Sequence, residues 1–213
     1  SMQTDLSGQV SLVTGAARGI GQAIADRLAS SGSKVYYTDL DETEAQQAAS
    51  SFEGCCGRAM DVTSPEAIDT LIQEVVNESG RLDILVNNAG TSIRKRPEDL
   101  TETEWHQVID TNLTSAFLCS KACYPIMKSA GAGKILNNGS MTSLFASPWS
   151  TAYASSKGGM VQFTKALATA WAPDNIQVNC FLPGWIISDL TMQARKDVPD
   201  LHEHVLKRSP ADR

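Results

Sequence analysis

Tyr153 and Lys157 are the first residues whose types and spacing indicate chemistry, because they lie four positions apart in the segment STAYASSKGG, residues 150–159. Side chains four residues apart meet on one face of a helix. A free tyrosine has a pKa of about 10, too high for a base at neutral pH, and a nearby ammonium group favours the phenolate. The pair is suited to exchanging a proton with a reacting oxygen, although such a pair also arises by chance in helices.

The glycine-rich segment VTGAARGIG, residues 13–21, is a second candidate, since it joins an apolar run to an amphipathic one. Gly15, Gly19 and Gly21 permit a tight turn, close approach of the backbone to a pyrophosphate, and intimate packing of helix on strand. The following helix N-terminus offers free N–H donors to a phosphate. The segment predicts a dinucleotide-binding turn, with Arg18 and Ile20 as further contacts; glycines that serve the turn alone are the alternative.

Asp39 closes the next apolar run, 18 residues after Gly21. A carboxylate at this distance accepts hydrogen bonds from the hydroxyls of an adenosine ribose and repels a 2′-phosphate. At about 4 Å and an effective dielectric of about 20, that repulsion is about 4 kcal/mol for a pair of unit charges. We therefore expect NAD to be favoured over NADP, although Arg18 can pair with a phosphate. A solvated acid at a strand end is the alternative for Asp39.

The elements that must position these groups alternate along the whole chain. Short apolar runs predict strands at residues 8–15, 34–39, 55–60, 82–90, 133–140 and 175–184. Helical patterns follow at residues 20–32, 41–52, 64–80, 101–111, 113–130 and 153–171, with Ser64 as an N-cap and Pro65 as a first helical residue. Strands that are apolar throughout and alternate with helices form a parallel sheet covered on both faces. We predict an α/β fold, a doubly wound parallel sheet in a single domain of residues 1–213.

Composition excludes several classes of function. A net charge of −6, with both signs spread along 213 residues, argues against a nucleic-acid surface. No apolar run approaches the roughly 20 residues of a membrane span, and the first residues lack a signal-peptide pattern. The five cysteines form no CxxC motif, so we expect free thiols in a reducing cytoplasm, with Cys55 and Cys56 on opposite faces of a strand. We expect no metal site, since His202 and His204 are only two residues apart.

The motifs together resemble one protein family. TGAARGIG at 14–21, NNAG at 87–90, Asn112, Ser140 and YASSK at 153–157 occur in the order and at the distances typical of the short-chain dehydrogenase/reductase superfamily. The resemblance covers nearly the whole chain. It implies a Rossmann fold and hydride transfer between a nicotinamide coenzyme and a secondary alcohol or ketone.

The resemblance also implies a role for each catalytic residue. Tyr153 would donate and accept the proton, Ser140 would hydrogen-bond the substrate oxygen, and Lys157 would lower the pKa of Tyr153 and hold the nicotinamide ribose. Asn112 would bend its helix and hold a water of the proton relay. A helix N-cap for Asn112 and a strand-end cap for Ser140 are the alternatives. Besides the glycine turn, Asp39, Tyr153 and Lys157, the implied coenzyme contacts are Asp61, Val62, Asn88, Ala89, Gly90, Pro183, Gly184, Ile186 and Ser188.

Two further expectations come from the family. Its members usually continue beyond the point where this sequence stops, so we expect the chain to lack the C-terminal strand of the family, with a substrate loop at about 184–208. The helical segments 113–127 and 153–171 carry more apolar residues than one face needs, including Phe117, Leu118, Phe163 and Leu167. Family members pair these helices across a two-fold axis, which implies a homodimer or homotetramer.

The substrate is indicated by the loop TSIRKRPEDL, residues 91–100. Arg94, Arg96 and the later Trp185 are candidates to contact an anionic small-molecule substrate, since arginine pairs with carboxylates; a solvated basic loop is the alternative. The loop resembles gluconate-type and sugar dehydrogenases, so we expect a sugar, sugar acid or polyol. A 3-oxoacyl-carrier-protein reductase is the alternative enzyme. A non-catalytic NAD-binding sensor or scaffold is the alternative of another class, and the intact Ser140, Tyr153 and Lys157 argue against it.

Overall fold

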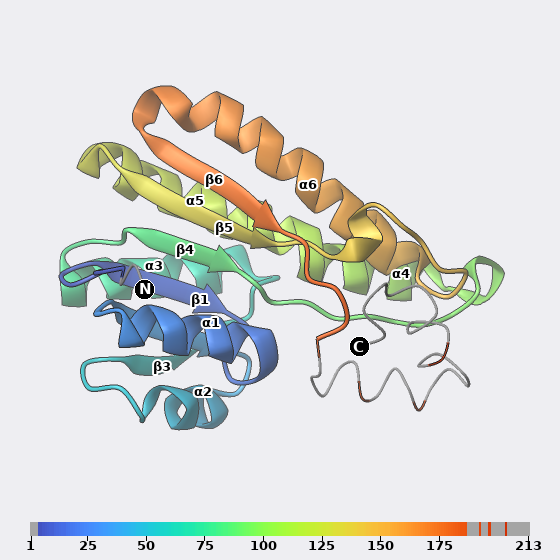
Figure 1. The fold of residues 1–213 in the computed structure, drawn as a ribbon, viewed down its shortest axis with the longest axis horizontal. Helices are drawn as coiled ribbons and strands as arrows, with labels where there is room; N and C mark the ends of the chain where they lie inside the picture. Colours follow the sequence, from blue (N-terminus) through green and yellow to red (C-terminus); the bar gives the residue numbers. More distant parts are fainter. Residues whose placement is uncertain (1–3, 187–191, 193–195, 197–202, 204–213) are drawn as a thin grey trace.

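The computed structural model describes residues 4–186 together with residues 192, 196 and 203 (Figure 1). Within them, six parallel strands form one sheet in the order β3-β2-β1-β4-β5-β6. The strands are β1 (Val10–Thr14), β2 (Lys34–Asp39), β3 (Cys56–Ala59), β4 (Ile84–Asn87), β5 (Gly133–Asn138) and β6 (Ile176–Phe181). The arrowheads in Figure 1 point toward one edge of the sheet, where all the strand ends gather. The predicted doubly wound parallel sheet is confirmed.

Helices connect the strands on both faces of the sheet. They are α1 (Gly19–Ser30), α2 (Glu42–Ala49), α3 (Pro65–Ser79), α4 (Glu102–Ile109), α5 (Ser115–Ala130) and α6 (Thr151–Trp171). The predicted start of α3 is confirmed, because the Ser64 side chain accepts a hydrogen bond from the Ala67 amide and Pro65 is the first helical residue. Proline suits that position because the first N–H groups of a helix have no intrahelical partner.

Two hydrophobic clusters hold the layers together, one on each face of the sheet. Leu12 and Tyr36 pack with α3 and α5 in the first cluster, whereas Val13 and Tyr37 pack with α1 and α2 in the second. Neighbouring residues of a strand point to opposite faces, so β1, β2, β4 and β5 contribute side chains to both clusters. Cys56 packs against the first cluster and Cys55 against the second, which confirms their expected orientations. The cysteines are all free.

The strand order creates the place for a ligand. The chain leaves β1 toward β2 on one side, and β4 pairs with β1 on the other side. Connections that diverge from such a switch point leave a crevice at the carboxyl edge of the sheet. The glycine turn after β1, the segment after β4 and the end of β5 all reach this edge.

The region between α4 and α5 differs in detail from the expected pair of α-helices. Residues Asp110–Thr114 form a π-helical turn between them. Such a turn widens the helix and bends it, and is frequent at functional sites. Asn112 sits in this turn and is only 1% exposed, so its side chain points inward.

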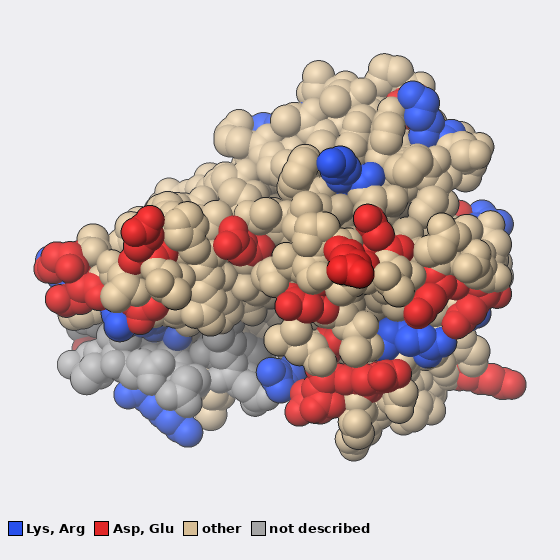
Figure 2. All heavy atoms as spheres, turned by 180° about the vertical axis from the view of Figure 1, so that it is seen from behind, with Lys and Arg blue, Asp and Glu red and all other residues tan. Residues whose placement is uncertain are grey.

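The surface of the described residues agrees with an acidic protein that carries both charge signs. On the face in Figure 2, acidic groups outnumber basic groups and the two are interspersed. None of the helices described has the length and apolar character needed to cross a bilayer. The part of the chain that the structure describes brings no three metal-ligating side chains together. Ser188, His202, His204 and most of the expected substrate loop lie outside the described residues.

Candidate active site

A cleft of about 470 Å³ opens at the carboxyl edge of the sheet. It joins the glycine turn to Ser140, Tyr153 and Lys157, residues that are far apart in the sequence. The sequence-predicted residues that line it are Gly15, Arg18, Gly19, Ile20, Gly21, Asp39, Asp61, Val62, Asn88, Ala89, Gly90, Ser140, Tyr153, Lys157, Pro183, Gly184 and Ile186.

The glycine turn is built for close approach. Gly15 has φ +63°, and a Cβ atom there would lie 2.9 Å from the Cα atom of Ala89. A Cβ atom on Gly21 would lie 2.1 Å from the carbonyl oxygen of Gly15. Helix α1 begins here with no side-chain cap. A turn that excludes side chains and ends in an uncapped helix N-terminus fits the pyrophosphate of a dinucleotide.

The glycine-turn end of the cleft carries two carboxylates, the half-buried Asp39 and the exposed Asp61. Asp39 accepts hydrogen bonds from the amides of Ala17, at 3.2 Å, and Leu40, at 2.9 Å, so it is held beside the glycine turn. Asp61 is exposed and accepts from the amide and hydroxyl of Thr63. These oxygens fit the ribose and adenine of a dinucleotide, because a carboxylate has acceptor capacity left for further donors.

Arg18 lines the cleft and forms an exposed ion pair. Its Nη1 atom lies 3.1 Å from Glu44 Oε2, and both side chains are at least half exposed. Glu44 lies in the first turn of α2, the helix that follows β2 and Asp39 in the chain. This pairing partner was not anticipated from the sequence.

Ser140 and Tyr153 both line the other end of the cleft, where the Ser140 side chain opposes a rise in the pKa of Tyr153. Ser140 Oγ also accepts from the Thr142 amide at 3.1 Å, as the cap of the 3-10 turn Met141–Ser143. The strand-end cap considered for Ser140 is therefore real, and it coexists with the position in the cleft. Capping fixes the hydroxyl where it faces Tyr153.

Lys157 is buried beneath this pair, with 3% of its surface exposed. Its Nζ atom donates to the carbonyl oxygen of Asn138 at 2.6 Å and lies 5.6 Å from the centroid of the Tyr153 ring. Burial disfavours the charged form and lowers the pKa of Lys157 to about 8.

Burial and two side chains shift the pKa of Tyr153. Burial raises its pKa, while the Ser140 side chain and the positive charge of Arg94 oppose that rise. Lys157, whose Nζ atom donates to Asn138, is not among the groups that shift the pKa of Tyr153. Acidification of Tyr153 by Lys157 therefore stays a prediction.

Asn112 joins the segment after β4 to helix α6. Its side chain accepts from the Thr91 amide at 2.7 Å, and donates to the Thr91 carbonyl at 2.9 Å and to Ser156 Oγ at 3.1 Å. It does not act as an N-cap, the alternative that the sequence left open, since α5 follows the π-helical turn directly. Asn112 braces the wall of the cleft.

The substrate candidates of the basic loop are outside the lining of the cleft. Arg96 lies 3.1 Å from Glu98 and stacks over Trp149 at 5.7 Å, so it is turned to the surface. Trp185 is 44% exposed. Arg94 is half-buried, and its positive charge opposes the rise in the pKa of Tyr153.

Sequence reasoning missed several residues of the cleft. They are Leu40, Met60, Thr63, Thr91, Gln107, Thr111, Asn138 and Gly139. Most are chain neighbours of predicted residues, and the end of each strand was the signal that could have found them. Gln107 and Thr111 come from α4 and the π-helical turn, and their spacing of four residues marks one helix face.

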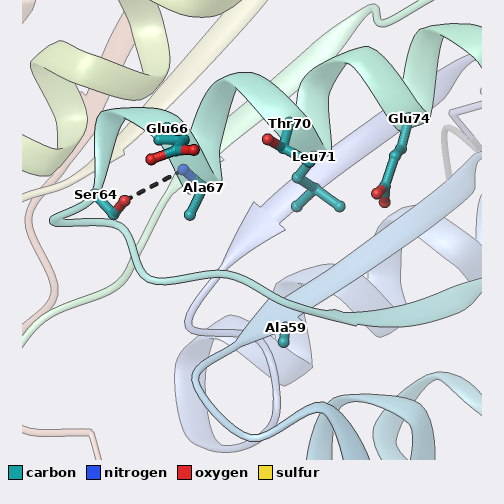
Figure 3. Close-up of a pocket in the computed structure, with 7 residues that line it drawn as sticks. All are labelled: Ala59, Ser64, Glu66, Ala67, Thr70, Leu71 and Glu74. Atoms are coloured by element: carbon teal, nitrogen blue, oxygen red, sulfur yellow. Dashed lines mark hydrogen bonds between the residues drawn. The ribbon is translucent and has the colours of Figure 1, made fainter.

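A second hollow, of about 380 Å³, lies between β3 and α3 (Figure 3). Its only marked contact joins the Ser64 hydroxyl to the Ala67 amide, which is the cap of α3. Glu66 and Glu74 extend from the same helix into solvent. We assign no chemistry to this hollow.

Comparisons with known proteins agree with the geometry. The sequence model described as short chain dehydrogenase matches residues 9–199. A 3-oxoacyl-[acyl-carrier-protein] reductase of Vibrio cholerae is 41% identical over 88% of this chain and 77% of its own length. A tropinone reductase homolog of Datura stramonium is 36% identical over 98% of this chain and 80% of its own length.

A solved structure extends the likeness to the fold. The gluconate 5-dehydrogenase of Burkholderia cenocepacia, in complex with NADP and tartrate, superposes with a TM-score of 0.92. It is 33% identical, and the match covers 99% of this chain and 84% of that protein. With the cleft, the glycine turn and these relatives, the chain belongs to the short chain dehydrogenase family and is an oxidoreductase that uses a nicotinamide cofactor to interconvert CH–OH and keto groups.

Proposed function

We propose that this chain moves a hydride between a nicotinamide dinucleotide and a secondary alcohol or ketone, with Ser140, Tyr153, Lys157 and Asn112 as the acting residues. The observation that carries the proposal is the cleft that Ser140, Tyr153 and Lys157 share with the glycine turn. The cofactor, when bound, supplies or accepts the hydride.

The residues divide the remaining work. When a ketone is reduced, the Tyr153 hydroxyl donates its proton to the oxygen that gains charge, and Ser140 holds that oxygen by a hydrogen bond. The raised pKa of Tyr153 keeps its proton available for this donation at neutral pH. Lys157 binds ribose hydroxyls from below, and Asn112 keeps the Thr91 segment and α6 in register.

We propose NAD as the favoured coenzyme. The Asp39 carboxylate beside the glycine turn would repel a 2′-phosphate, and Glu44 pairs with Arg18, the nearby arginine able to bind such a phosphate. The related gluconate 5-dehydrogenase was solved with NADP, and titration of this chain with both coenzymes tests the preference.

We propose a sugar acid, or a related sugar or polyol, as the substrate. Arg94 supports this choice, because its charge acts on the Tyr153 hydroxyl and a guanidinium pairs with a carboxylate. The relative that was solved with tartrate, a dicarboxylate, has a ligand of the same chemistry.

A 3-oxoacyl-carrier-protein reductase is the second candidate. Beside Ser140 and in the segment that leads to α6, four large apolar side chains are 40% exposed or more: Met141, Leu144, Phe145 and Trp149. An acyl chain would cover such side chains, and the Vibrio cholerae relative carries that activity in its name.

A substrate panel tests both candidates. Purified protein is assayed with NAD and NADP against sugar acids, aldoses and polyols, and with the reduced coenzymes against 3-oxoacyl thioesters. Turnover of sugar acids supports the proposal, and turnover of thioesters alone supports the second candidate. Coenzyme binding without turnover on the whole panel favours a sensor or scaffold.

We propose that the protein is a homodimer or homotetramer in the cytoplasm. Phe117 on α5 is 48% exposed and Phe163 on α6 is half-buried, whereas Leu118 and Leu167 pack against the core. Free cysteines suit a reducing compartment. Sedimentation of a monomer at micromolar concentration would contradict the oligomer.

A further inference from the structure

Asn138 ends β5, two residues before Ser140, and lines the cleft while only 7% of it is exposed. Its Nδ2 atom donates to Oδ1 of Asn88 at 2.8 Å. Asn88 follows β4, the neighbouring strand of the sheet. A hydrogen bond between amide side chains thus ties the ends of two strands together on the floor of the cleft.

The orientation of both amides is determined by the backbone of the glycine turn. Asn88 Nδ2 donates to the carbonyl oxygens of Thr14, at 3.1 Å, and Gly15, at 3.0 Å, which uses both of its hydrogens. Asn88 Oδ1 must therefore accept, and Asn138 must present its nitrogen. A Cβ atom on Gly21 would lie 2.3 Å from Asn88 Nδ2, so this amide lies directly beneath the turn.

The backbone of Asn138 serves the opposite end of the cleft. Its carbonyl oxygen accepts the 2.6 Å hydrogen bond from Lys157 Nζ. Asn138 Oδ1 has no hydrogen-bond partner in the described part of the chain. An unpaired buried acceptor lowers the stability of the folded protein, and an apolar side chain would avoid that loss. The favourable contribution of the Asn138 amide is therefore the hydrogen bond that its Nδ2 atom donates to Asn88.

We propose that Asn138 is a positioning residue that fixes the glycine turn and Lys157 relative to each other. The pyrophosphate and the nicotinamide ribose of the coenzyme can then be bound at the same time. The inference rests on the proposed function, because it concerns how that coenzyme is held. Asn138 acts through Asn88 and Lys157 and takes no part in proton transfer.

The adjacent Asn137 offers a matched control. It is fully buried on the same strand, donates to Thr164 Oγ1 at 2.9 Å and accepts from Asn87 at 2.8 Å, and it does not line the cleft. Asn137→Ser therefore removes a buried amide of similar connectivity from the opposite face of β5. The comparison separates loss of stability from loss of coenzyme positioning.

The test is the dissociation constant of NADH, measured by fluorescence titration of the full chain. Asn138→Ser is expected to weaken binding about five-fold or more, as the loss of a buried hydrogen bond allows. Asn138→Leu, which fills the space without a donor, is expected to weaken it as much. Asn137→Ser is expected to stay within about two-fold of the original protein, although its melting temperature falls. The substrate KM is expected to hold in the Asn138 variants while the coenzyme KM rises.

A double-mutant cycle decides whether Asn138 acts through Asn88. If it does, Asn88→Ser and the Asn88→Ser, Asn138→Ser double variant bind NADH equally. Additive losses, an equal loss in Asn137→Ser, or unchanged affinity in both Asn138 variants would overturn the inference. Failure of the original protein to bind NADH or NADPH would instead overturn the proposed function.

Discussion

The two ends of the cleft hold charge in opposite environments. At the adenosine end, Asp61 and Arg18 are exposed, and the only pairing partner of Arg18 in the described structure is Glu44, which is exposed as well. At the catalytic end, Lys157 is buried and its pKa falls to about 8, while the pKa of Tyr153 rises. Charges in water interact weakly with one another. Burying a charge costs free energy and shifts the pKa of the group that carries it.

This difference in exposure predicts a different function for each end of the cleft. If the open end selects between coenzymes, as we propose, it does so by small differences in electrostatic energy, which salt screens. The buried end fixes protonation states, so single substitutions there should change rate and stability by much more. Substitutions at the two ends test this contrast.

Tyr153→Phe is expected to have the largest effect on the turnover number, because it removes the proton donor and leaves the rest of the cleft unchanged. The turnover number should fall by about a thousand-fold, within the range for general acid–base groups. NADH affinity, measured by fluorescence, should be unchanged. Tyr124→Phe is the control, since Tyr124 donates to Asp174 far from the cleft and stacks on Trp171. Equal rates for the two variants would refute the role of Tyr153.

Lys157 should make stability depend on pH in a direction set by its lowered pKa. Between about 8 and its ordinary 10.5, the unfolded chain binds a proton that the folded chain does not, so the original protein gains stability as pH rises. Relative to Lys157→Met, the gain should reach about 3 kcal/mol. Urea unfolding without added coenzyme from pH 7 to 10.5 measures it. A difference that stays constant with pH would show that the lysine is not desolvated.

The contrast also explains what the sequence could predict. Gly15 and Gly21 could be predicted from the sequence, because a turn of this kind requires glycine. A Cβ atom at either position would clash with neighbouring backbone atoms. Strand ends are visible as well, so Asp39 and Ser140 were placed correctly on the cleft. The direction of Lys157 Nζ toward Asn138, the pairing of Arg18 with Glu44 and the influence of Arg94 on Tyr153 depend on contacts between distant segments. Such contacts cannot be predicted from the spacing of residues along one helix.

Asp39→Asn tests the role of charge at the adenosine end, because it removes the negative charge and keeps a hydrogen-bond acceptor. We expect the ratio of NADP to NAD affinity to rise about ten-fold, less than the about 4 kcal/mol of unscreened repulsion because the site is open to water. Asp61→Asn is the comparison, and it should weaken both coenzymes alike. Titration with both oxidised coenzymes measures the ratios, and an unchanged ratio in Asp39→Asn would remove the basis for NAD preference.

Arg94→Gln tests whether the loop belongs to the catalytic end. The KM for a sugar acid should rise about ten-fold through loss of a charge-assisted hydrogen bond, while that for a neutral polyol holds. Because Arg94 lowers the pKa of Tyr153, its removal should move the acid limb of the alcohol-oxidation profile to higher pH. Lys95→Gln, which removes a loop charge paired with Glu104, should change neither. A parallel KM change for acid and polyol would argue against a carboxylate contact.

Glu44→Gln should give the smallest effect, because it breaks an ion pair in water. Exposed pairs contribute about 0–1 kcal/mol, so freeing Arg18 should strengthen NADP binding about two- to three-fold and leave NAD unchanged. Glu42→Gln removes the same charge from the same helical turn, where Glu42 contacts Gln46 rather than Arg18. A gain in Glu44→Gln alone would identify the contact, whereas equal gains would identify the general field of α2. In both cases the gain should shrink as salt rises above about 0.15 M, where the screening length falls below about 8 Å. A salt-insensitive gain would mean that this end of the cleft is drier than its exposed side chains indicate.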